Sequence, residues 1–112
     1  MSNYGRERPN IQFDYKLIDL GNITNDIHPN VEFKFQNLGN NPVVINKVFA
    51  SCGCTSTQWT KAPVLPNNQG NIAVSIDLGG FNGFFSKSII VKFNKCDKPF
   101  KLTVKGNVNV QI

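Results

Sequence analysis

The sequence predicts an all-β protein, with an immunoglobulin-like antiparallel β-sandwich of about seven strands as its architecture. Apolar and polar residues alternate over several short stretches, which is typical of strands that bury one face. Asn, Gly and Pro interrupt these stretches at short intervals, as expected for turns between strands. No stretch shows a convincing helical period. A small barrel is the alternative architecture.

The 112 residues divide into a flexible N-terminal arm, residues 1–10, and one domain, residues 11–112. A domain of this size can bury a sufficient core without disulfides or metal. The clearest strand is 31–37, where Val31, Phe33 and Phe35 alternate with three polar residues. The predicted strands are residues 11–15, 17–21, 31–37, 43–50, 72–78, 85–93 and 102–110.

Proline and glycine mark the breaks between these strands. Pro42 restricts the residue before it to an extended conformation and favours a strand from Val43 onward. Residues 62–70 are Pro- and Asn-rich and predict a loop. Gly106 interrupts the last strand and predicts a bulge or the close approach of another group.

The net charge of +5 comes entirely from residues 79–112, which contain six lysines against Asp97 alone. Such a region can face an acidic partner, although lysines alternating with apolar residues also fit the solvent side of a hairpin. Arginines and interleaved aromatic residues are missing there, which argues against specific nucleic-acid binding. The candidate partner-binding residues are Tyr4, Arg6 and Arg8 of the arm, with Lys87, Lys92, Lys101 and Lys105.

Cys52 and Cys54 flank Gly53 where a β-branched run ends. On an extended strand their Cα atoms would lie about 6.6 Å apart, at the upper edge of disulfide geometry. Gly53 could bend the backbone enough for a bridge, which would make a redox dithiol. We favour the alternative, in which one or both cysteines are small buried hydrophobic residues at a tight strand end.

No metal, cofactor or enzyme activity is predicted. Cys52, Cys54, Cys96 and His28 together have the ligand types that zinc accepts, but their spacing matches no common zinc motif. The single histidine lies in an Asn-rich loop, so no cysteine has an evident base. The carboxylates at strand positions or strand ends form no catalytic pair; these are Asp14, Asp19 and Asp77.

Three motifs follow one another along the chain: Phe33-x-Phe35-x-Asn37-x-Gly39-x-x-Pro42-Val43-x-Ile45, then Val48-x-Ala50-Ser51-Cys52-Gly53-Cys54-Thr55, then Lys105-Gly106-Asn107-Val108. Their order resembles one bacterial family of immunoglobulin-like domains of unknown function, abundant in Bacteroidota and distantly similar to Hydin-type modules. The resemblance covers most of residues 11–110 and implies a scaffold-like role, with Ser51, Cys52, Gly53, Cys54 and Thr55 as a structural signature. Typical members are exported or lipid-anchored, and their Pro-Gly-Glu turn is replaced here by Pro66-Asn67-Asn68-Gln69-Gly70.

We therefore expect a non-enzymatic structural module that binds other proteins, as a small component decorating a large assembly such as a phage capsid. The polar first ten residues carry no signal peptide, which favours a virion protein made in the host cytoplasm. The alternative is a periplasmic or surface module of the cell envelope whose export signal was removed. A thiol or metal site at Cys52 and Cys54 is a third hypothesis. The sequence predicts no membrane insertion and leaves the oligomeric state open.

Overall fold

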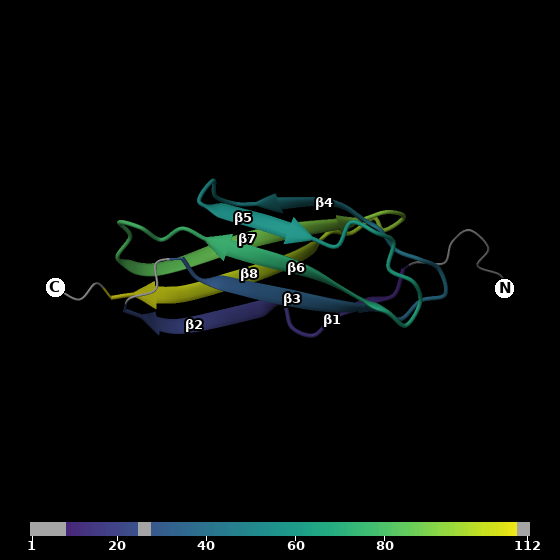
Figure 1. The fold of residues 1–112 in the computed structure, drawn as a ribbon, viewed down its shortest axis with the longest axis horizontal. Helices are drawn as coiled ribbons and strands as arrows, with labels where there is room; N and C mark the ends of the chain where they lie inside the picture. Colours follow the sequence, from purple (N-terminus) through teal and green to yellow (C-terminus); the bar gives the residue numbers. More distant parts are fainter. Residues whose placement is uncertain (1–8, 25–27, 110–112) are drawn as a thin grey trace.

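The computed structural model describes residues 9–24 and 28–109, which fold into two packed four-stranded sheets (Figure 1). Neighbouring strands are antiparallel except β2 and β8, which are parallel. The prediction of an all-β sandwich is confirmed. Sheet A has the order β1 (Ile11–Phe13), β3 (Asn30–Asn37), β6 (Gln69–Ile76), β5 (Thr55–Trp59). Sheet B has the order β2 (Leu17–Ile23), β8 (Phe100–Val108), β7 (Gly83–Phe93), β4 (Ile45–Ala50).

The core lies between the sheets and follows the predicted alternation. Phe33 and Phe35 of β3 are fully buried, and so are Ile89 of β7 and Leu102 of β8. The ring of Phe35 meets that of Phe93 edge to face, with centroids 5.1 Å apart, and this contact joins sheet A to sheet B. Burying each such side chain contributes about 1.5–3 kcal/mol, so the inner faces hold the two sheets together.

The first two strands belong to different sheets. The sequence predicted two segments with a bend between them, and β1 indeed pairs with β3 while β2 pairs with β8. Asp14 N still donates to Lys34 O in sheet A at 2.9 Å, whereas Lys16 O already accepts from Thr103 N in sheet B at 2.8 Å. The bend is therefore the point where the chain changes sheets.

One strand, β5, was not predicted. Its sequence, Thr-Ser-Thr-Gln-Trp, shows no apolar alternation, and its residues are only partly buried or exposed. The available signal was the strand preference of Thr and Trp. It pairs with β6 in antiparallel register and is one of the two edge strands of sheet A, with β1 at the other edge.

Asn37 is the buried polar residue that fixes the loops at one end of the sandwich. Its Nδ2 donates to Asn41 O at 2.8 Å and to Val64 O at 2.9 Å. Its Oδ1 accepts from Gly39 N at 2.9 Å. The side chain is fully buried, so these bonds satisfy groups that water cannot reach.

Gly106 is a point of close approach, as the sequence predicted. A Cβ atom there would lie 2.9 Å from Phe85 Cε1 and 3.2 Å from Gly21 O. The irregularity of register lies instead on the neighbouring strand β2, between Asp19 and Asn22. Gly21 takes the left-handed conformation that this irregularity requires, with φ of +67°.

Candidate functional site

The outer face of sheet B carries a concentration of lysines. Phe85, Ile89 and Val104 point inward and are buried, so the residues that alternate with them on β7 and β8 point outward. On this outer side Lys47 lies opposite Lys92. We call the following set the basic face: Lys47, Phe49, Phe84, Lys92, Lys101 and Lys105, with Asp19 as its acidic member.

Two exposed aromatic rings lie among these lysines. Phe49 is 41% exposed on the edge strand β4. The Nζ atoms of Lys47 and Lys92 lie 4.9 and 5.9 Å from its ring centroid, within cation–π range. Phe84, toward the other end of the face, is 83% exposed.

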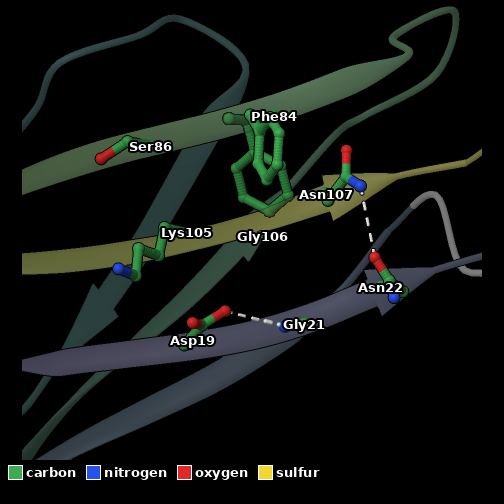
Figure 2. Close-up of a pocket in the computed structure, with 9 residues that line it drawn as sticks. Asp19, Gly21, Asn22, Phe84, Ser86, Lys105, Gly106 and Asn107 are labelled. Atoms are coloured by element: carbon green, nitrogen blue, oxygen red, sulfur yellow. Dashed lines mark hydrogen bonds between the residues drawn. The ribbon is translucent and has the colours of Figure 1, made fainter.

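Below Phe84 the basic face is hollowed into a groove of about 480 Å³, across β2, β8 and β7 (Figure 2). Asp19 Oδ1 accepts from Gly21 N at 2.9 Å, and Asn22 Oδ1 accepts from Asn107 Nδ2 at 3.2 Å. These bonds fix the polar wall that β2 contributes. The groove is lined by Asp19, Gly21, Asn22, Phe84, Phe85, Ser86, Lys105, Gly106 and Asn107.

The groove offers groups that can bind another polypeptide. Ser86 and Asp19 flank Lys105 in register on the neighbouring strands, beside the exposed ring of Phe84. This combination can hold a polar side chain and an apolar one of another polypeptide. Across the part of the chain that the structure describes, no three His, Cys, Asp or Glu residues cluster so as to hold a metal ion.

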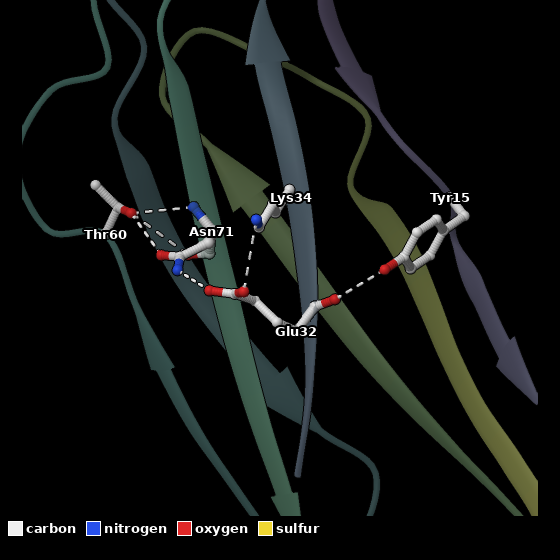
Figure 3. A network of polar contacts seen from close by, with 5 residues as sticks. All are labelled: Tyr15, Glu32, Lys34, Thr60 and Asn71. Carbon is white, nitrogen blue, oxygen red and sulfur yellow. Dashed lines mark hydrogen bonds and ion pairs between the residues drawn. The ribbon is translucent and has the colours of Figure 1, made fainter. Parts of the chain in front are cut away.

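The outer face of sheet A is different, because the charged side chains of β3, Glu32 and Lys34, are paired with each other (Figure 3). Lys34 Nζ lies 4.0 Å from Glu32 Oε1, and Asn71 Nδ2 donates to the same carboxylate. Thr60 Oγ1 donates to Asn71 Oδ1 at 2.9 Å, and Tyr15 OH reaches Glu32 O at 3.5 Å. The polar groups of this network bond to one another, so its charges are balanced. The outer face of sheet B, in contrast, has more lysines than carboxylates.

The predicted partner-binding residues divide into three groups. Lys92, Lys101 and Lys105 lie together on the basic face. Lys87 lies opposite Val104 and is half-buried on the inner side of β7, so it does not join them. The predicted arm residues Tyr4, Arg6 and Arg8 lie outside the described residues.

Three members of the basic face were not singled out from the sequence. Lys47 and Phe49 lie far from the lysine-rich region in sequence, and only the pairing of β4 with β7 brings them to it. Phe84 precedes Phe85 directly, and neighbouring residues of a strand point to opposite sides. The Phe-Phe pair was therefore a signal that one ring faces solvent.

The cysteine stretch forms the turn between β4 and β5, at the predicted place. Ser51 N donates to Ser88 O at 2.9 Å, and Ser51 Oγ accepts from Ser88 N at 3.0 Å. Thr55 N donates to Cys52 O at 3.1 Å and begins β5. Hydrogen bonds of the main chain and of Ser51 therefore define this turn.

Cys52 and Cys54 form a disulfide, which our preferred interpretation of one or both as buried packing residues did not include, although Cys54 does pack against the core. Both are only half-buried, and their Cα atoms lie 5.2 Å apart. The extended-strand spacing of about 6.6 Å does not apply, because the backbone turns here.

The candidate zinc ligands are not assembled. Cys96 follows β7 at the end where β4 begins, whereas the disulfide follows the end of β4. The six residues of β4, about 20 Å of strand, separate them. His28 Nδ1 lies 3.8 Å from Asp77 Oδ1, and both side chains are exposed.

The family described as protein of unknown function, DUF1573, matches residues 11–108. The chain belongs to the DUF1573 family. This agrees with the resemblance to a family of unknown function that the sequence motifs indicated. Among curated proteins nothing matches the DUF1573 chain. The residues that the structure describes include no helix long and apolar enough to cross a bilayer.

Solved structures resemble the DUF1573 chain in fold. A protein of unknown function from Porphyromonas gingivalis W83 aligns with a TM-score of 0.75 and 12% identity, over 90% of this chain and 47% of that one. The chain thus spans about half the length of the Porphyromonas protein. PapD-like domain 7 of human CEP192 has a TM-score of 0.71 and 6% identity, over 91% of this chain and 87% of that one. The YadV chaperone has a TM-score of 0.56 and 10% identity, over 91% and 52%. At these identities the likeness shows an immunoglobulin-like and PapD-like fold.

Proposed function

We propose that this DUF1573 chain is a non-enzymatic protein-interaction module whose basic face docks on an acidic surface of a partner protein. The observation that carries the proposal is the uneven charge of that face. This face carries four lysines with Asp19 as its acidic member, whereas on the opposite face Lys34 is paired with Glu32. The four lysines are Lys47, Lys92, Lys101 and Lys105. Such an arrangement speeds encounter with an acidic surface and disfavours basic ones.

The exposed rings supply the apolar part of the contact. Phe84 and Phe49 are large side chains that lose water when a partner covers them, which is the property of residues that dominate binding energy. The lysines around them form a polar rim. Affinity would therefore depend mostly on the rings, and the rate of association mostly on the lysines.

The edge strands of sheet B, β2 and β4, favour docking by a face rather than by strand addition. The register of β2 is interrupted between Asp19 and Asn22, and that of β4 between Ile45 and Lys47. Such irregularities and edge lysines blunt an edge against pairing with another chain. A small sandwich with blunted edges suits a component that covers a large assembly.

The more specific part of our proposal is that this assembly is repeated, such as a phage capsid that the chain decorates as a virion protein. This part rests on the size of the domain, the face described above and analogy with small β-sandwich components. We also propose that residues 51–55 are a structural signature of the family and that the family is distantly similar to Hydin-type modules.

The alternative is a binding module of the cell envelope, in the periplasm or at the surface. The Cys52–Cys54 disulfide favours a place outside the reducing cytosol, because disulfides persist in oxidising surroundings. A virion exterior and an envelope compartment both meet this condition.

The test is to fractionate source cells and released particles on a density gradient and to locate the chain with an antibody. Co-sedimentation with DNA-filled particles, with crosslinks from Lys92, Lys101 or Lys105 to an acidic shell protein, would support the capsid proposal. Co-sedimentation with envelope membranes would overturn the capsid proposal in favour of the alternative. Crosslinks confined to Lys34 on the outer face of sheet A would overturn the assignment of the basic face.

A further inference from the structure

We propose that Cys52 and Cys54 are a thiol–disulfide exchange site, which passes its disulfide to the paired thiols of another protein. The proposal does not rest on the docking function described above. It rests on how the turn is held, on the space beside it and on the different surroundings of the two sulfurs.

The turn keeps its shape through hydrogen bonds that do not involve the sulfur–sulfur bond. Ser51 and Ser88 exchange two hydrogen bonds at 2.9 and 3.0 Å. On the other side, Asp77 N donates to Cys54 O at 2.9 Å and ties the turn to the residue after β6. A reduced turn would retain all of these bonds, so the fold has no need of the disulfide for its local geometry.

The disulfide also closes the shortest kind of loop. Cys52 and Cys54 are two positions apart in sequence, and the stabilisation that a cross-link gives grows with the length of the loop it closes. The buried core between the sheets is formed by other residues. A cross-link at this position would therefore contribute little to the stability of the fold. We infer that its role is chemical instead.

An incoming thiol has room to reach the pair. Both cysteines are half-buried rather than enclosed, and Gly53 between them is exposed. A Cβ atom built on Gly53 would meet nothing within 4 Å, so the space on that side is open. A half-buried disulfide with open space beside it can be reached by another thiol, as exchange requires.

The two sulfurs have different roles. Cys54 packs against the hydrophobic core, and its Sγ has a longer polar contact, 3.9 Å, with Thr55 Oγ1. Cys52 Sγ accepts a hydrogen bond from Cys54 N at 3.2 Å, which would stabilise a thiolate on Cys52. Cys52 is therefore the sulfur that bonds to the partner, and Cys54 is the resolving residue.

The exchange balances without any further reagent. A partner thiolate attacks Cys52 Sγ, the Cys52–Cys54 bond breaks, and Cys54 leaves as a thiolate that takes a proton from water. The second thiolate of the partner then attacks its own sulfur in the mixed disulfide and releases Cys52. Two electrons and two protons have passed from the partner dithiol, which is now oxidised, to this chain, which is reduced.

The first test uses the Cys96→Ala variant, so that the two cysteines are the reporting thiols. The oxidised protein is equilibrated in buffers of graded reduced-to-oxidised glutathione ratio, quenched, alkylated and weighed by mass spectrometry. We expect a reversible shift between no alkylation and two alkylated thiols, with an unchanged circular dichroism spectrum. The proposal would be overturned if the disulfide stayed closed in excess reduced glutathione. It would also be overturned if reduction unfolded the protein, because the disulfide would then have a structural role.

The second test separates the two sulfurs. In the same Cys96→Ala background, Cys54→Ser leaves the Cys52 thiol and Cys52→Ser leaves the Cys54 thiol. We expect oxidised glutathione to form a mixed disulfide with Cys52 about tenfold faster, because that thiolate is stabilised and less packed. Equal or reversed rates would overturn the assignment of roles. The Cys52→Ser/Cys54→Ser variant is the folding control, and a cooperative melt close to that of the parent is expected.

Discussion

The ring of Phe35 lies across Gly70, its cross-strand partner in sheet A. A Cβ atom on Gly70 would stand 2.8 Å from Phe35 Cε1 and 3.0 Å from Val64 Cγ2. Phe85 and Gly106 repeat the arrangement in sheet B, where the corresponding distance is 2.9 Å. Each sheet thus places a glycine under a buried ring, so that the ring can pack flat against the backbone.

Gly70→Ala should therefore destabilise the domain by overpacking. We expect a loss of about 1–3 kcal/mol in the free energy of unfolding, measured by urea titration. Gly53→Ala is the matched control, because its Cβ would meet nothing within 4 Å, and it should change stability by less than about 0.5 kcal/mol. Similar losses in both variants would contradict the close packing of Phe35 on Gly70.

Asn37→Ala should lower the free energy of unfolding by about 1–3 kcal/mol, because it removes three hydrogen bonds that a fully buried side chain makes to the surrounding loops. Val64 O and Asn41 O would lose a donor and Gly39 N would lose its acceptor. Thermal unfolding of the variant beside Asn46→Ala, an exposed asparagine of β4, measures the difference. A midpoint for Asn37→Ala within two or three degrees of the control would be evidence against this role of the side chain.

Phe84→Ser should separate binding from stability. Phe84 is 83% exposed, so its removal should change the free energy of unfolding by less than about 0.5 kcal/mol. The dissociation constant for the partner that crosslinks to the basic face should rise at least about tenfold. The control is Phe33→Leu in sheet A, whose ring is fully buried and does not line the groove, and it should show the reverse, lower stability with little change in affinity. Unchanged affinity in Phe84→Ser would remove Phe84 from the interface.

Charge reversal on the basic face should slow association. We expect Lys101→Glu/Lys105→Glu to lower the association rate constant by about tenfold at low ionic strength, with a smaller difference at high salt. Lys34→Glu makes a charge reversal on the opposite face and should leave the rate within about twofold. Surface plasmon resonance across a salt series gives both rates. A rate that falls equally in both variants would indicate an effect of net charge alone.

The sequence predicted what depends on local alternation. The strand from Val31 to Asn37 and the hairpin of β7 and β8 follow directly from apolar residues at every second position. Alternation shows which residues share a face but not which strand lies alongside. For this reason the sequence did not predict the change of sheet between β1 and β2. It also did not predict that Lys47 lies beside Lys92.

Two other features were not predicted from the sequence, each for a physical reason. Strand β5 is held by hydrogen bonds to β6 rather than by an apolar pattern, so its residues carried only a weak signal. The disulfide was judged against an extended backbone, whereas the chain turns between Ala50 and Thr55 and shortens the distance between Cys52 and Cys54. In both cases the tertiary context decided what local spacing left open.

The parallel pairing of β2 with β8 has a consequence for when this protein becomes competent to bind. These strands lie far apart in sequence, so β2 has no place in sheet B until β8 has been synthesised and folded. Closing so long a loop is entropically costly, which makes this pairing a late step of folding. Because the groove spans β2, β8 and β7, it is absent from a nascent or partly folded chain. A partner that recognises the groove would bind fully folded molecules and would not bind partly folded ones.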